Sequence, residues 1–128
     1  MTIQRGGGIA VDKLDSIFEL QKELDRFIEE HRNLDDIPYE VWMQKDILAI
    51  IAELGELLDE VNFKWWKNPK EIDKASIKEE LADILHFFIS MCIRTGMDPE
   101  ELYCVYHNKN KENFNRQLGR SAKSGYKI

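Results

Sequence analysis

The sequence predicts an all-α protein built as a four-helix bundle. Apolar residues recur with a period near 3.6 in four separate stretches, and residues typical of helix ends border these stretches. No segment alternates apolar and polar residues for long enough to indicate a strand. At 128 residues the chain is expected to hold a single helical domain over 11–118, a flexible N-terminal arm over 1–10 and a flexible C-terminal tail over 119–128.

The first helix is expected over about residues 11–31, where Leu14, Phe18 and Ile28 lie at helical spacing and the polar Gln21 falls inside the apolar stripe. Gln21 has two interpretations at this stage. It is either an ordinary polar residue packed between helices or part of a binding site.

A second helix is expected to follow directly. Asp35 or Asp36 can cap it, Pro38 suits its first turn, and the helical period then runs to about Asn62. A loop carrying Asn68-Pro69 ends this segment.

The last two helices have recognisable starts. Ser76-Ile-Lys-Glu79 is a capping-box pattern, and Gly96 is placed to end the helix that it starts. That third helix is apolar on nearly every side between residues 81 and 93, which predicts that it is buried. Asp98-Pro99 repeats the helix-start pattern and opens the fourth helix.

Two pairs of acids stand out on the second and third helices. Glu53 and Glu56, and then Glu80 and Asp83, are each three residues apart and therefore share a helix face. Two antiparallel helices would bring the four carboxylates to one small volume, where like charges need an opposing cation. Mg²⁺ prefers oxygen ligands and keeps waters for a phosphate substrate, so metal-assisted attack on a phosphate chain is the expected chemistry.

The alternative is that these acids form solvated helix faces, which are common in a chain with 24 Asp and Glu residues. Two features favour the metal site. The small residues Ala49 and Ala52 lie beside Glu53 and Glu56, which suits close approach of another backbone, and the second acid pair lies on the apolar third helix. A buried acid requires a partner.

Composition excludes several classes of protein. The formal charge of −6 argues against a general nucleic-acid binder. Cys92 and Cys104 lack any metal-ligand spacing and are expected to be reduced packing thiols. The N-terminal residues do not resemble a secretory signal, and the apolar stretch from Ile84 to Ile93 is too short to span a bilayer. A cytoplasmic protein that binds neither membrane nor nucleic acid is expected.

The fourth helix changes from apolar to polar partway along. Beyond Leu102 and Val105 one face is mostly amides and cations. It carries Tyr106, Lys109, Asn110, Asn113 and Gln117, with Arg116 beside them. Either this helix end projects into water, or the face binds an anion. Lys and Arg neutralise phosphate oxygens and Asn supplies neutral hydrogen bonds.

Four motifs follow one another along the chain: Glu53-x-x-Glu56 with Asp59, Phe63-Lys64-Trp65-Trp66-Lys67, Glu80-x-x-Asp83-Ile84-x-His86-Phe87, and Tyr106-x-x-Lys109-Asn110-x-x-Asn113-x-x-Arg116-Gln117. In this order they resemble the motifs of the all-α dimeric dUTPases, within the superfamily that includes MazG-type nucleoside triphosphate pyrophosphohydrolases. The resemblance extends over nearly the whole chain, and FKWWK and KNxxNxxRQ are its more specific motifs.

The resemblance implies hydrolysis of dUTP to dUMP and pyrophosphate, with Mg²⁺, or Mn²⁺ in its place, held by Glu53, Glu56, Glu80 and Asp83. Water activated by the metal would attack the α-phosphorus, and Glu53 or Glu56 would take its proton. The two glutamates remain alternatives for this role.

The resemblance also assigns the substrate contacts. Phosphate contacts fall to Lys64, Lys67, Lys109, Asn110 and Arg116, and base or sugar contacts to Gln21, Asp25, Trp66, His86, Phe87 and Asn113. An aromatic ring can stack on a pyrimidine while a carboxamide reads its polar edge. Without the resemblance, His86 would be interpreted as a core histidine and Trp66 as a packing or interface aromatic.

Two departures from the family pattern affect this interpretation. Asp25 replaces the asparagine that family members carry four residues after the glutamine of the first helix. A carboxylate here can accept a hydrogen bond from uracil N3–H or from a cytosine amine.

The second departure is in length. Larger relatives carry an extra helical stretch between the third and fourth helices, whereas here Gly96 leads almost directly into Asp98-Pro99. A core this compact is expected to complete itself as a homodimer or tetramer. The tail either folds over bound nucleotide or is disordered.

Three functions therefore remain. The first is a dUTP pyrophosphohydrolase, and the second is a MazG-like enzyme that acts on other or several nucleotides such as dCTP. The third is a non-enzymatic helical interaction module.

Overall fold

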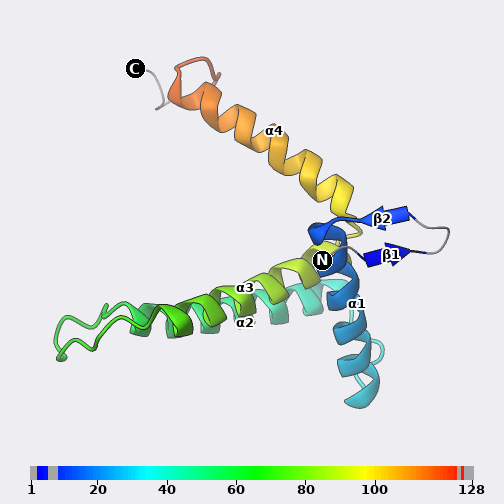
Figure 1. The fold of residues 1–128 in the computed structure, drawn as a ribbon, viewed down its shortest axis with the longest axis horizontal. Coiled ribbons are helices and arrows are strands. Elements are labelled where there is room, and N and C mark those ends of the chain that lie inside the picture. The colour runs from blue at the N-terminus through cyan, green and yellow to red at the C-terminus, as the bar shows by residue number, and fades with distance from the viewer. Residues whose placement is uncertain (1–2, 6–8, 124, 126–128) are drawn as a thin grey trace. The chain divides into compact units, whose positions relative to one another are not determined.

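The structure, a computed structural model, describes residues 3–5, 9–123 and 125. Its described residues form four helices and two short strands (Figure 1): β1 (Ile3–Arg5), β2 (Ile9–Val11), α1 (Lys13–His31), α2 (Tyr39–Glu60), α3 (Lys74–Arg94) and α4 (Pro99–Gln117). The predicted all-α class is confirmed. Among the described helices, none has the length and apolar character needed to cross a membrane.

The two strands correct the prediction that the chain has none. β1 pairs antiparallel with β2, so that Ile3 lies opposite Val11 and Arg5 opposite Ile9. Each strand has three residues, which is too short to produce a recognisable alternating pattern. Residues 6–8, between the strands, lie outside the described residues.

Two of the predicted helix starts are wrong. The N-cap of α2 is Pro38, with no side-chain cap, and Asp36 instead adopts a positive φ of 63° in the preceding turn. The N-cap of α3 is Asp73, whose side chain accepts hydrogen bonds from the backbone of Ala75 and Ser76 and from the Ser76 hydroxyl at 2.8 Å. The predicted capping residue Ser76 therefore lies inside the first turn.

The other helix ends follow local sequence rules. α1 begins at a reciprocal capping box between Asp12 and Asp15, two residues later than predicted. Asp98 caps α4 through a 2.7 Å hydrogen bond from the Glu101 N–H, with Pro99 in the first turn as expected. Gly96 follows the end of α3 with a φ of 85°, which a glycine adopts without strain.

The chain divides into two compact units, Met1–Gly96 and Met97–Ile128, which are described separately. In the first unit α2 runs along α3, and α1 packs against α3 (Figure 1). The second unit contains α4. Helices α1, α2 and α3 therefore form the packed framework on which the acids of α2 and α3 are placed.

The centre of the first unit is small and partly polar. Phe18 and Ile89 are the fully buried large hydrophobic residues, and Gln21 and Ser90 are buried beside them. The prediction that α3 is buried on all sides is wrong for this chain, because Leu81 is 51% exposed, and Leu85 and Phe88 are similarly open. In this unit α1 and α2 are the helices that pack on α3, and two helices leave part of its circumference open.

Candidate functional site

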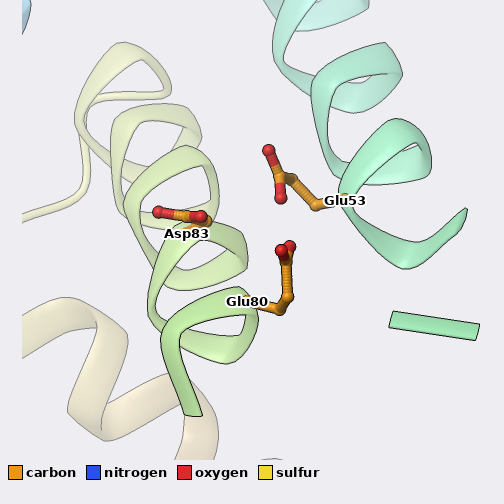
Figure 2. A group of neighbouring side chains, drawn as sticks. All are labelled: Glu53, Glu80 and Asp83. Atoms are coloured by element: carbon orange, nitrogen blue, oxygen red, sulfur yellow. The ribbon is translucent and has the colours of Figure 1, made fainter. Parts of the chain in front are cut away.

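Three of the four predicted acids gather between α2 and α3. Oxygen atoms of Glu53, Glu80 and Asp83 lie within 4.8 Å of one another. Figure 2 shows Glu53 reaching from α2 toward Glu80 and Asp83 on α3. The spacing of three residues puts Glu80 and Asp83 on one face of α3, and the pairing of α2 with α3 brings Glu53 opposite them. Glu56 is exposed and lies outside this group of three.

The electrostatics of this acid cluster (Glu53, Glu80 and Asp83) are unfavourable without a cation. The pKa of the Glu80 carboxyl is raised to about 7, chiefly because it would share a proton with Glu53, and further because burial and the negative charge of Glu56 disfavour ionisation. Although Glu56 lies outside the cluster, it is thus close enough to act on Glu80.

The cluster fits a hard divalent cation. Glu53 Oε2 and Glu80 Oε2 are buried, and within the described part of the chain no hydrogen-bond donor reaches either atom. Buried carboxylate oxygens normally have a partner. A donor set made entirely of carboxylate oxygens suits Mg²⁺ or Mn²⁺ and not a thiophilic metal. The residues present therefore fit the predicted metal, and Glu53, Glu80 and Asp83 are the side chains able to hold it.

A cavity of about 430 Å³ opens beside the acid cluster, between α1, α2 and α3. Its wall includes Glu53 and Asp83 from the cluster. It also includes four of the residues predicted to contact the base: Gln21, Asp25, His86 and Phe87. The structure therefore brings these four predicted base residues and two of the predicted metal ligands, Glu53 and Asp83, to one space.

Three polar residues and one aromatic residue recur along the face of α3 that borders this cavity. Asp83, Phe87, Ser90 and Arg94 follow one another at intervals of four, three and four residues and all line the cavity. At a rise of about 1.5 Å per residue, Ser90 lies roughly 10 Å along the helix from Asp83. The cavity thus has an acidic end at the cluster and a hydrogen-bonding region two turns away.

The hydrogen-bonding region joins α1 to α3. Gln21 Nε2 donates to Asp25 Oδ1 at 2.9 Å and to Ser90 Oγ at 3.0 Å. The Ser90 hydroxyl donates to both Asp25 oxygens, each at 2.9 Å, and His86 Nδ1 is hydrogen-bonded to Gln21 Oε1. Gln21 is 5% exposed, so its amide is almost wholly occupied by partners within the protein.

An ion cluster that the sequence analysis missed closes the far end of the cavity. Arg94 Nε donates to Asp46 at 3.2 Å, Arg94 Nη1 donates to Glu29 at 3.2 Å, and the guanidinium carbon lies 3.9 Å from the centre of the Trp42 ring. Desolvation raises the pKa of the buried Asp46, and the charge of Arg94 opposes that rise. Ser90 and Arg94 had one sequence signal: they are polar residues in or directly after the apolar stretch of α3.

The predicted phosphate residues Lys64 and Lys67 lie apart from this cavity. They line a second hollow, of about 210 Å³, in the segment between α2 and α3. Lys64 is paired with Asp59 at 3.5 Å. Trp66 is 60% exposed in the same segment and contacts Phe63 edge to face, with ring centres 6.1 Å apart.

The remaining predicted residues belong to α4, in the second unit. Arg116 Nη1 donates to Asn113 Oδ1 at 3.3 Å, and Arg116 Nε lies 3.4 Å from Glu112. A hydrogen bond from Ser121, with the charge of Arg116 and Lys109, lowers the pKa of Glu112. Asn110 is exposed. The carboxylate of Glu112 therefore offsets part of the positive charge of Lys109 and Arg116 on this helix.

A comparison with known protein families finds a match over most of the helical part of the chain. A family model described as dUTPase matches residues 13–101, which include α1, α2, α3 and all three acids of the cluster. No solved structure matches the chain.

Several curated proteins are similar over part of the chain. A dCTP pyrophosphatase of Enterobacteria phage T4 is 36% identical over 57% of this chain and 51% of its own length. A dCTP pyrophosphatase of Enterobacteria phage LZ5 is 49% identical over 58% of this chain and 43% of its own. The uncharacterized protein YpjD of Bacillus subtilis is 30% identical over 62% of this chain and 68% of its own. The chain thus spans about half the length of the two phage relatives.

Proposed function

The chain belongs to the dUTPase family of all-α, MazG-like proteins, and on that premise we propose that it is a nucleoside triphosphate pyrophosphohydrolase. The reaction is cleavage of a pyrimidine deoxynucleoside triphosphate between the α- and β-phosphates, yielding the monophosphate and pyrophosphate. The candidate substrates are dUTP, from the family, and dCTP, which is favoured by the names of the two phage relatives.

One observation carries this proposal: a single cavity has two acids of the cluster, Glu53 and Asp83, at one end and polar and aromatic side chains suited to a base farther along. A triphosphate placed at Asp83 would extend its base toward Ser90, roughly 10 Å along α3. Phe87 offers a ring for stacking in between.

Glu53, Glu80 and Asp83 would hold Mg²⁺, or Mn²⁺ in its place. Such an ion supplies positive charge to the phosphate chain and lowers the pKa of the attacking water. Glu56 is the better proton acceptor of the two candidates, because its exposed carboxylate lies outside the cluster yet acts on Glu80. In this assignment Glu53 serves only as a metal ligand.

The cationic residues supply the remaining phosphate contacts in this proposal. Lys64 and Lys67 from the segment after α2, and Lys109 and Arg116 from α4, neutralise charge on the triphosphate, and Asn110 donates a neutral hydrogen bond to it. Trp66 and Asn113 contact the base or sugar. These roles rest on the motif resemblance, and the hollow beside Lys64 and Lys67 is wide enough to admit an anion.

The protein is proposed to act as a homodimer or tetramer. Among the residues whose burial is described, the buried hydrophobic ones are Phe18, Ile89 and Cys92, which is a small core for the chain length. Apolar residues of α2 such as Leu48 and Ile51 are 64% and 57% exposed. Light scattering coupled to size exclusion should give at least twice the monomer mass, and a monomer at micromolar concentration would contradict this assignment.

The decisive experiment measures pyrophosphate release from dUTP, dCTP, dTTP, UTP and dATP with and without Mg²⁺. Glu80→Gln should lower kcat/KM at least 100-fold, because it removes a ligand charge from the cluster. Glu79→Gln is the matched control: the same change one residue away on α3, outside the cluster. No Mg²⁺-dependent cleavage of any nucleotide would overturn the enzyme proposal and leave the interaction module.

A further inference from the structure

The polar groups in the middle of the cavity form a closed network whose hydrogen-bond directions can be worked out. An ionised carboxylate only accepts hydrogen bonds, so the amide nitrogen of Gln21 must face Asp25. The carbonyl oxygen Oε1 of Gln21 therefore faces His86, and His86 Nδ1 must carry the proton that it shares with this oxygen. Asp25 thus determines both the orientation of the Gln21 amide and the tautomer of His86.

This network uses up its own donors. Both N–H groups of Gln21 are engaged, one with Asp25 and one with Ser90, and the single Ser90 hydroxyl hydrogen is directed at Asp25. The network therefore offers a ligand the carboxylate oxygens of Asp25, which are acceptors, while the hydrogens of Gln21 and Ser90 are already engaged.

The cation of the cavity wall, Arg94, is likewise engaged with other acids. Arg94 lies one helical turn beyond Ser90 and is directed at Asp46 and Glu29. A base edge placed against Asp25 must consequently bring the hydrogens itself, because a carbonyl facing this carboxylate would meet no donor and would be repelled.

From this arrangement we propose that Asp25 selects a base by its exocyclic amino group, and that the preferred substrate is dCTP and not dUTP. The inference rests on the proposed pyrophosphohydrolase function. Cytosine presents an amine with two N–H donors where uracil presents the O4 carbonyl. Uracil N3–H can also donate to one oxygen of Asp25, but this N–H lies between two carbonyls, which the other oxygen of the carboxylate repels. A site built to pair with a group rejects an analogue that lacks it, since the polar atoms of the site are then left without partners.

Gln21 and Ser90 act here as positioning residues. They are 5% and 2% exposed, which leaves them little surface for a ligand, and together they hold both oxygens of Asp25 from two helices. This assignment differs from the sequence expectation that the Gln21 carboxamide itself reads the base. A carboxylate held in one rotamer discriminates more sharply than a mobile one, because no ordering cost falls on the ligand.

The test compares dCTP and dUTP in wild type and in Asp25→Asn, which keeps the size of the side chain but adds an N–H pair able to face a carbonyl. Wild type should favour dCTP at least tenfold in kcat/KM. Asp25→Asn should shift the ratio at least tenfold toward dUTP, and Ser90→Ala should shift it less in the same direction. Glu23→Gln, an equal change at an exposed α1 position outside the cavity, should leave the ratio unaltered.

A second readout does not need turnover. Calorimetric titration with dCMP and dUMP, without metal, should show tighter binding of dCMP in wild type and loss of that preference in Asp25→Asn. Preference for dUTP or dATP, or an unchanged ratio in both variants, would overturn the base assignment while leaving the enzyme standing. Absence of any cleavage together with a dCMP preference would overturn the proposed function and leave the base assignment intact.

Discussion

Replacing Arg94 by methionine tests the ion cluster that ties three helices together. The change keeps an unbranched side chain beside Trp42 but leaves Asp46, which is 6% exposed, without the guanidinium to which it is hydrogen-bonded. Removing one partner of a fully buried ion pair leaves the other charge unpaired and lowers the free energy of unfolding by about 3–5 kcal/mol. Because Asp46 borders a cavity that water can enter, we expect about 2–3 kcal/mol of lost unfolding free energy at pH 7.

The pH dependence separates a stranded charge from lost packing. Burial raises the pKa of Asp46 above its ordinary value of 3.8 even with Arg94 present, so removing Arg94 raises it further. A carboxyl whose pKa is higher in the folded than in the unfolded state costs stability as the pH rises through the interval between the two values. The destabilisation in Arg94→Met should therefore be largest at pH 7 and shrink toward pH 4, where Asp46 takes up a proton.

The assay is urea denaturation at fixed protein concentration, at several pH values between 4 and 7. Lys22→Met is the control, since Lys22 and Glu19 form an exposed pair at 3.9 Å whose loss should change stability by less than about 1 kcal/mol. When Arg94→Met is compared with the wild-type Arg94 in an Asp46→Asn background, the loss of stability should no longer depend on pH. A loss of stability in Arg94→Met that is equal at pH 4 and pH 7 would refute the stranded-charge argument.

Three further predictions follow from other parts of the structure. Because the pKa of Glu80 is raised to about 7, a proton must leave this carboxyl before the cluster binds Mg²⁺. The Mg²⁺ affinity measured by calorimetry should therefore rise between pH 6 and pH 8, and equal affinities at the two pH values would contradict the ligand assignment. Phe18→Ala should lower the free energy of unfolding, measured in urea, by about 3–5 kcal/mol. Leu20→Ala, at a position that is 58% exposed, should lower it by less than about 1 kcal/mol. Asp98→Ala should remove about 1 kcal/mol of helix stabilisation, measurable as a lower melting temperature by circular dichroism, because the Glu101 N–H loses its acceptor.

Local signals predicted most of the framework. The helical period placed four helices to within a few residues, and Asp98-Pro99 and Gly96 marked helix ends that the structure bears out. The errors arose where two local solutions compete. At α3 both Asp73 and Ser76 are good caps, and Asp73 prevails because it satisfies two backbone N–H groups and the Ser76 hydroxyl together.

The acid site was predictable because helix geometry is periodic. A spacing of three residues places Glu80 and Asp83 on one face whatever the rest of the chain does, and antiparallel pairing with α2 then brings Glu53 near. Glu56 shows the limit of the same rule. It shares a face with Glu53 and acts on Glu80, yet it lies outside the group of three, a difference that the spacing alone does not predict.

The amino-acid sequence by itself determined the helices, the acid pairs and the presence of a polar residue, Gln21, in an apolar stripe. Tertiary structure alone decided that Gln21 meets Asp25, Ser90 and His86, and that Arg94 is held by acids from two other helices. Periodicity follows from the backbone within one helix. The partner of a side chain 65 positions away depends on the register between helices, which many apolar contacts set jointly and no short motif encodes.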